Sequence, residues 1–148
     1  MISVEALSLD IGAAPILRDV SFALEPRRVL GLVGESGSGK SMTALSILRL
    51  LPRGARVAGR VTLEGRDLYA LTERQMCDLR GREAAMIFQE PMTALNPVQT
   101  IGDQVAETLL VHGVARRVEA MARAKDRLAR VGLAPDRFPL SRYPFELS

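Results

Sequence analysis

The sequence predicts an α/β fold, and three observations carry that prediction. Residues 3–11 and 16–24 alternate apolar and polar side chains, as half-buried strands do. Residues 29–33 form a short, continuously apolar run, which is typical of a strand buried on both faces. A glycine-rich stretch then leads into residues 41–51, where apolar side chains recur at helical spacing. We therefore expect a β-rich N-terminal region that passes through a glycine-rich loop into a helix.

Three further elements are expected in the middle of the chain. Residues 57–64 have the pattern of a strand, which Gly65 ends. Residues 72–79 are predicted to form a short helix with Thr72 as its N-cap, because a threonine hydroxyl can accept a bond from a backbone N–H of the first turn. Residues 84–88 are apolar and are predicted to form a second buried strand.

The pattern becomes helical towards the C-terminus. Helices are expected over residues 101–112 and 115–131, separated by Gly113. The second of these is expected to bury one face, formed by Val118, Met121, Ala122, Leu128 and Ala129. We accordingly divide the chain into an α/β part, residues 1–92, and a helical part, residues 93–148.

Composition and charge exclude several classes of protein. A chain of 148 residues fits one compact domain, and its apolar runs are far shorter than the roughly 18 residues of a membrane-spanning helix. The net charge of +3 does not indicate nucleic-acid binding, because basic and acidic residues are interleaved and no Trp offers a platform for bases. Cys77 is the only cysteine, which excludes an internal disulfide and fits a reducing compartment.

The glycine-rich stretch matches the pattern of a phosphate-binding loop, or P-loop. The motif G-x-x-x-x-G-K-[ST] is met by Gly34, Glu35, Ser36, Gly37, Ser38, Gly39, Lys40 and Ser41. Such a loop can curl so that backbone N–H groups surround an anion, and the helix that follows adds the partial positive charge of its N-terminus. In this motif the lysine reaches the β- and γ-phosphates and the next hydroxyl ligates magnesium. The sequence therefore predicts binding of ATP with Mg²⁺, with a further phosphate contact from the backbone N–H of Met42.

The surroundings of this loop resemble one family. Residues 31–41 resemble the first nucleotide motif of ABC transporter ATPases. Residues 86–97, Met-Ile-Phe-Gln-Glu-Pro-Met-Thr-Ala-Leu-Asn-Pro, resemble the Q-loop segment of the oligopeptide, dipeptide and nickel importer branch. Residues 143–148 resemble the lead-in to the family's signature sequence, ending after its first two residues. The resemblance implies the core of a P-loop NTPase of the ABC ATPase type, followed by the start of a helical subdomain, as an incomplete domain.

The resemblance also implies an activity, site residues and partners. It implies an ATP-hydrolysing subunit of an importer for peptides or related small solutes, peripheral to the cytoplasmic face of the inner membrane. Its partners would be integral-membrane permease subunits and a second ATP-binding subunit. By the same resemblance, Lys40 and Gln89 would be catalytic, with Gln89 sensing magnesium and the attacking water, and Ser148 would touch the γ-phosphate held by the opposite subunit.

Four positions depart from the family pattern or lie outside it. Ile11 stands where many members place an aromatic residue that stacks on adenine, and Met42 stands where many have threonine. Phe145 occupies a position where this branch usually shows histidine. The only histidine, His112, matches no family motif and is expected to be a surface or helix-cap residue.

The chain lacks one feature that phosphoryl transfer needs. A P-loop enzyme uses a second carboxylate to hold magnesium, and no apolar run followed by Asp-Glu occurs here. We therefore expect the N-terminal portion of a longer ATPase, which binds nucleotide but is not hydrolytically competent alone. Two alternatives stay open at this point: a soluble P-loop NTPase or kinase with its own small-molecule substrate, and a non-catalytic nucleotide-binding module.

Overall fold

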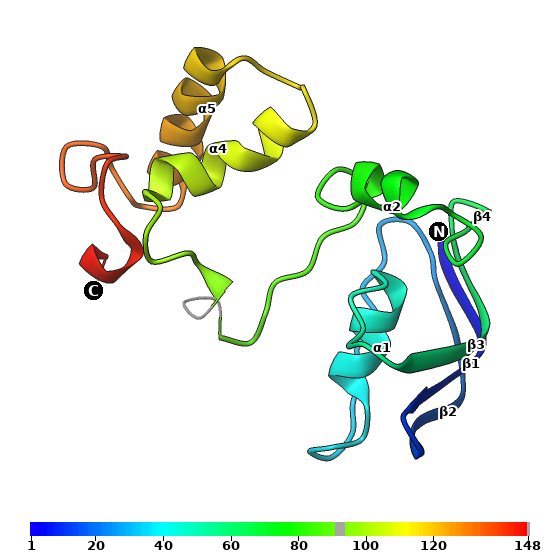
Figure 1. Cartoon of the computed structure of the whole chain (residues 1–148). Coiled ribbons are helices and arrows are strands. Elements are labelled where there is room, and N and C mark those ends of the chain that lie inside the picture. Colours follow the sequence, from blue (N-terminus) through cyan, green and yellow to red (C-terminus); the bar gives the residue numbers. More distant parts are fainter. Residues whose placement is uncertain (91–93, 148) are drawn as a thin grey trace. The chain divides into compact units, whose positions relative to one another are not determined.

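The computed structural model describes residues 1–90 and 94–147. The chain forms two compact units, Met1–Ala84 and Ala85–Ser148, each of which is described by itself (Figure 1). The boundary expected between residues 92 and 93 falls on residues outside the described part of the chain and stays a prediction.

The first unit is built on a four-stranded antiparallel sheet of order β2-β1-β3-β4. Its strands are β1 (Ile2–Ile11), β2 (Ala14–Leu24), β3 (Ala55–Leu63) and β4 (Arg66–Asp67). The central strand β1 pairs with both β2 and β3, so that Val4 lies opposite Phe22 on one side and Val61 on the other. The strands expected over residues 3–11, 16–24 and 57–64 are therefore confirmed.

A bulge in β1 sets which of its side chains enter the core. The buried residues Val4, Leu7 and Leu9 are spaced unevenly along the strand, and the pairing with β3 shifts register between Glu5 and Ser8. An extra residue at a bulge turns the following side chains to the other face of the sheet, so Leu7 points inward where strict alternation would bury Ala6.

Two short helices complete the first unit. Helix α1 (Lys40–Ile47) is shorter than the helix expected over residues 41–51, because Arg49 adopts a positive φ of 53° shortly after its end. Helix α2 (Glu73–Leu79) begins as predicted at Thr72, whose hydroxyl accepts from the backbone N–H of Gln75. Met76 and Leu79 of α2 join the core beneath the sheet, together with the buried residues of β1 and β3.

The two buried strands predicted over residues 29–33 and 84–88 are wrong for this structure. Neither stretch is a strand, and Val29, Val33 and Ile87 are 99%, 94% and 91% exposed. A strand forms only when its backbone N–H and C=O groups find a neighbouring strand. Within residues 1–90 and 94–147 these stretches gain no ladder partner, apart from one isolated bridge between Arg80 and Ala84.

The second unit contains a pair of packed helices, α4 (Ile101–Val111) and α5 (Arg117–Arg130), followed by a short 3-10 helix, η1 (Pro144–Glu146). The α4 and α5 predictions are confirmed, but the predicted buried face of α5 is only partly right. Val118 is 87% exposed, whereas Ala120, Ala124 and Leu128 are buried. Small alanine side chains let α5 approach α4 closely, so that face packs. Among the described residues, no helix is both long and apolar enough to cross a membrane.

Candidate functional site

The glycine-rich loop joins two parts of the first unit. After β2 the chain turns at residues 25–28, where the Arg28 N–H donates to the Glu25 carbonyl at 3.2 Å. It then runs without regular secondary structure to the start of α1 at Lys40. A turn within the loop is closed by the Ser38 N–H, which donates to the Glu35 carbonyl at 3.2 Å. Ser36 and Gly37 lie at the exposed tip of this turn.

Lys40 holds the loop from inside. Its ammonium group donates to the carbonyl oxygens of Gly34 and Glu35, at 2.7 and 2.6 Å. A longer bond of 3.2 Å reaches the hydroxyl oxygen of Ser38. These contacts use the three donors of an ammonium group, and the longest of them is the one most easily exchanged for an oxygen of a bound anion. The lysine thus fixes the curvature of the loop and keeps its charge within it.

Two glycines permit the close approaches that shape this loop. A Cβ on Gly34 would lie 2.5 Å from the Ser38 hydroxyl oxygen, inside the curl. A Cβ on Gly39 would lie 2.5 Å from a methyl group of Leu17, and Gly39 also has a φ of +89°. Leu17 belongs to β2, so the end of the loop rests on the sheet. Sequence reasoning missed Leu17, because nothing in the motif identifies its packing partner.

The N-terminus of α1 has no side-chain cap. Gly39 stands at its N-cap position and no acidic residue occupies its first turn. By contrast, α2 is capped by Thr72 and α4 by Thr100. The first backbone N–H groups of α1, which include those of Ser41 and Met42, therefore keep the partial positive charge that attracts anions. The Ser41 residue is exposed beside them, and Met42 is partly buried against the core of the first unit.

Gln89 lies in the second unit, at a bend that follows residues 85–88, which have no regular secondary structure. It is exposed and lines a shallow pocket of about 380 Å³ with Phe88, Glu90 and Ala94. The role of Gln89 at a nucleotide stays a prediction.

The chain after Gln89 is fixed to α4 by Gln104, which sequence reasoning did not single out. The Gln104 side-chain oxygen accepts from the Asn96 N–H at 2.9 Å, and its amide nitrogen donates to the Asn96 carbonyl at 2.9 Å and to the Gln99 carbonyl at 3.0 Å. Glutamine is an ordinary helix residue, so the sequence offers no signal for this clamp.

The segment that precedes Ser148 is also fixed to the start of α4. The N–H groups of Ile101 and Gly102 donate to the carbonyls of Arg142 and Leu140, at 2.8 and 3.0 Å. A Cβ on Gly102 would come within 2.7 Å of the Leu140 Cβ, so only glycine allows this approach. Ser148 itself lies outside the described residues, and its expected contact with a second nucleotide stays a prediction.

The remaining positions noted from the sequence lie apart from the loop. Ile11 ends β1, where it pairs with Ala14 of β2. Phe145 is 67% exposed and stacks on Tyr143, with ring centroids 5.7 Å apart. His112 is the C-cap residue of α4, and Cys77 is an exposed free thiol. The part of the chain that the structure describes contains no cluster of three or more His, Cys, Asp or Glu side chains suited to a metal ion.

Known proteins match most of the chain. Residues 17–148 match the family described as ABC transporter. A protein of Sinorhizobium fredii, named as a peptide ABC transporter ATP-binding protein, is 49% identical over 134 residues, which are 89% of this chain and 40% of that protein. A protein of Brucella abortus, named as a peptide import ATP-binding protein, is 48% identical over 139 residues, 89% of this chain and 41% of its own length. The chain thus spans about two fifths of the length of these curated relatives.

Solved structures bear on the fold alone. The dimeric structure of the bacterial ABC transporter cassette MJ0796 superposes with a TM-score of 0.82 at 23% identity, covering 100% of this chain and 63% of that one. A post-hydrolysis state of the same cassette, bound to ADP and Pi, superposes with a TM-score of 0.79 at 22% identity and the same coverage. The predicted fold class, an α/β core of the ABC ATPase type followed by helices, is confirmed by these superpositions.

Proposed function

The chain belongs to the ABC transporter family, and from this premise we propose that it is the ATP-binding, energy-coupling subunit of an importer for peptides or related small solutes. The observation that carries the proposal is the loop at residues 34–41, held in a curl by Lys40 and opening onto the uncapped N-terminus of α1. The names of the two bacterial relatives, which share nearly half of their aligned residues with it, support peptides as the cargo.

The loop fits the phosphates of a nucleotide. Gly34 keeps the inside of the curl free of a side chain, since a Cβ there would fill it. The backbone N–H groups of Ser36 and Gly37 and those at the start of α1 would donate to phosphate oxygens, and Lys40 would exchange its contact with Ser38 for one of them. The carbonyl contacts of Lys40 with Gly34 and Glu35 would meanwhile hold the loop in place.

The same loop fits magnesium at one position. The Ser41 hydroxyl follows Lys40 directly, and oxygen is the ligand type that Mg²⁺ prefers. Gln89 would supply a second oxygen from its side chain. Magnesium, when bound, neutralises charge on phosphate oxygens. Both residues lie on exposed segments, so each has room to reach a ligand.

Hydrolysis is expected to need more than the residues present in this chain. The residues close to Lys40 in the first unit are loop carbonyls and a serine hydroxyl, and the sequence offers no second carboxylate motif. We propose that the chain alone binds Mg-ATP without steady turnover. In the importer it would act beside a second ATP-binding subunit and integral-membrane permeases, on the cytoplasmic face of the inner membrane.

Recovery of its partners tests this function directly. An affinity-tagged copy, expressed in its own cells, is purified from detergent-solubilised membranes, with an untagged strain as the control, and the proteins retained are identified by mass spectrometry. The proposal predicts enrichment of proteins with several membrane-spanning helices over the control. Two results would contradict it. The chain could be recovered from the soluble fraction alone with no partner, or it could be recovered there together with a soluble enzyme that transfers phosphate to a small molecule.

A further inference from the structure

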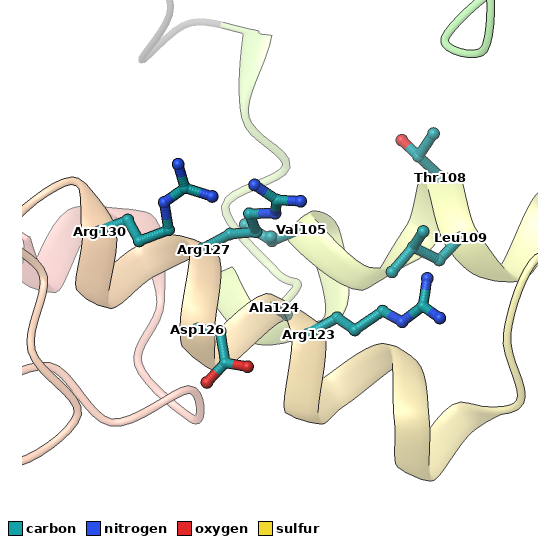
Figure 2. Close-up of a pocket in the computed structure, with 8 residues that line it drawn as sticks. All are labelled: Val105, Thr108, Leu109, Arg123, Ala124, Asp126, Arg127 and Arg130. Atoms are coloured by element: carbon teal, nitrogen blue, oxygen red, sulfur yellow. The ribbon is translucent and has the colours of Figure 1, made fainter.

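Arginine side chains lie in two different settings in this chain. Those of α5 line an open pocket of about 570 Å³ in the second unit, where Arg123, Arg127 and Arg130 extend from their helix (Figure 2). In the first unit, by contrast, the side chains of Arg49 and Arg80 are only 22% and 19% exposed, and both donate to backbone carbonyls. Burying a guanidinium group is costly unless its donors find acceptors, so the carbonyls that accept from Arg49 and Arg80 matter to this unit.

Two side chains bind the C-terminal end of α1, the helix that follows the phosphate-binding loop. Arg80 donates from Nε to the Leu48 carbonyl at 2.8 Å and from Nη2 to the Arg49 carbonyl at 3.3 Å. The Tyr69 hydroxyl donates to the Ser46 carbonyl at 2.9 Å. The last carbonyls of a helix have no regular partner within it, so side chains that donate to them hold that end in place.

Further contacts run in the opposite direction and fix these side chains. Arg49, just after α1, donates to the carbonyls of Leu68 and Leu71 at 3.0 and 2.6 Å. Arg80 is held in turn by Glu73 at the start of α2, with 2.5 Å between the guanidinium nitrogen and the carboxylate oxygen. The end of α1 is therefore tied to α2, whose own buried side chains belong to the core of the first unit.

Helix α1 has little apolar anchoring of its own. Its buried residues are Thr43 and Ser46, whose hydroxyls donate to the carbonyls of Gly39 and Met42 at 3.1 and 2.7 Å. Met42 and Ile47 are only partly buried against the core. Apolar packing is non-directional, whereas hydrogen bonds fix the distance and angle between two groups. The polar contacts at the C-terminal end of α1 therefore set where the helix stands along its axis.

We propose that Arg80 and Tyr69 are positioning residues for the phosphate-binding loop, an inference that rests on the function proposed above for that loop. By holding one end of a helix of about two turns, they set where its first N–H groups and Lys40 stand at the other end. A misplacement of about 1 Å is enough to weaken contacts with a bound group. Neither residue touches the nucleotide itself, because both bind carbonyls at the far end of α1 from Lys40.

Binding of Mg-ATP to variants of the 148-residue chain tests the positioning role. Arg80→Ala removes both bonds to the carbonyls at the end of α1 and should weaken binding by the folded chain about tenfold. Tyr69→Phe keeps the ring and removes one bond, so it should weaken binding about threefold. Arg80→Lys should recover part of the loss, because an ammonium group can still donate to one of the two carbonyls. Isothermal titration gives the dissociation constants.

Two control variants separate positioning from charge and from stability. Arg74→Ala removes the same charge from α2, but Arg74 is exposed and, among the described residues, bonds no carbonyl of α1. Gly59→Ala strains the sheet, where a Cβ would meet the Ala6 carbonyl, and leaves α1 untouched. Both controls should bind Mg-ATP within about twofold of the wild type. Losses equal to that of Arg80→Ala in either control would overturn the proposal.

A measurement without nucleotide follows the helix itself. In amide NMR spectra, Arg80→Ala and Tyr69→Phe should shift the N–H signals of Ser41 and Met42, at the other end of α1, whereas Arg74→Ala should not. Tyr69→Phe decides the outcome where Arg80→Ala does not fold. Unchanged signals in a chain whose wild type binds Mg-ATP would overturn the positioning role alone. A wild type that binds no Mg-ATP would overturn the proposed function of the loop, and the positioning role with it.

Discussion

The antiparallel sheet of the first unit and the two apolar runs at residues 29–33 and 84–88 are alike in composition and opposite in structure. In the sheet, Val4, Leu7 and Val61 are at most 1% exposed, whereas Val29 and Ile87 are more than 90% exposed. The strands of the sheet find partners close by, since β1 and β2 are joined by a tight turn. The apolar runs find no ladder partner among the described residues. Apolar sequence alone therefore does not make a strand; a hydrogen-bonded neighbour does.

The candidate nucleotide site follows one of these apolar runs in the sequence and packs on the sheet. The run at residues 29–33 leads directly into the loop, yet the loop keeps a defined curl. Its shape comes from the bonds of Lys40 to Gly34 and Glu35, and from the packing of Gly39 on Leu17 of β2. The site thus depends on its own residues and on the sheet, and not on a formed strand before it.

The largest expected effect is on the free energy of unfolding, and it distinguishes a substitution in the packed sheet from one in an exposed apolar run. Leu7→Ala should lower the free energy of unfolding by about 2–5 kcal/mol, because it removes a fully buried side chain and leaves a cavity. Ile87→Ser should change it by no more than about 0.5 kcal/mol, since the side chain is already in water. Urea unfolding of both variants provides the comparison. Similar losses in the two would mean that residues 84–88 are buried in solution.

A smaller effect is expected at the bulge of the sheet. Gly59 has a φ of +93°, and a Cβ there would lie 2.4 Å from the Ala6 carbonyl oxygen. Gly59→Ala should therefore lower the free energy of unfolding by about 1–3 kcal/mol. Gly12→Ala is the matched control, because Gly12 has a positive φ but open space around it. If thermal unfolding showed equal losses in the two variants, backbone conformation alone would explain them, and the close approach at the bulge would play no part.

The smallest effect concerns acid sensitivity in the second unit. The Thr100 hydroxyl, which donates to the Asp103 carboxylate, and the Arg117 guanidinium together hold the pKa of Asp103 below its usual value. This stabilisation is complete above the ordinary pKa of Asp, about 4, and is lost as the pH falls through the lowered value. Asp103→Asn should therefore reduce the loss of helix signal between pH 4 and 2, followed by circular dichroism. Unchanged acid sensitivity would place the effect elsewhere.

The sequence predicted those parts of the fold that local pattern controls. The helix start at Thr72, the helices α4 and α5 and the three long strands all follow from caps and periodicity. The buried face of α5 was only partly predicted. The apolar pattern of the sequence gives weight to large side chains, whereas the structure buries the small side chains of Ala120 and Ala124. In the candidate site, the motif identified Lys40 and the glycines. It could not identify Leu17 beneath Gly39 or the Gln104 clamp, since those contacts depend on tertiary packing.

The central claim is that Lys40, within its loop, makes this chain a nucleotide-binding protein. The chain has only two lysines, Lys40 in the loop and Lys125 on the exposed surface of α5, and they form a matched pair. Isothermal titration with Mg-ATP should show saturable binding by the wild type and by Lys125→Ala, with affinities within about twofold of each other. Lys40→Ala should weaken binding by at least about tenfold, because it removes a charged contact to phosphate. Equal binding by all three proteins, or none by the wild type, would contradict the claim.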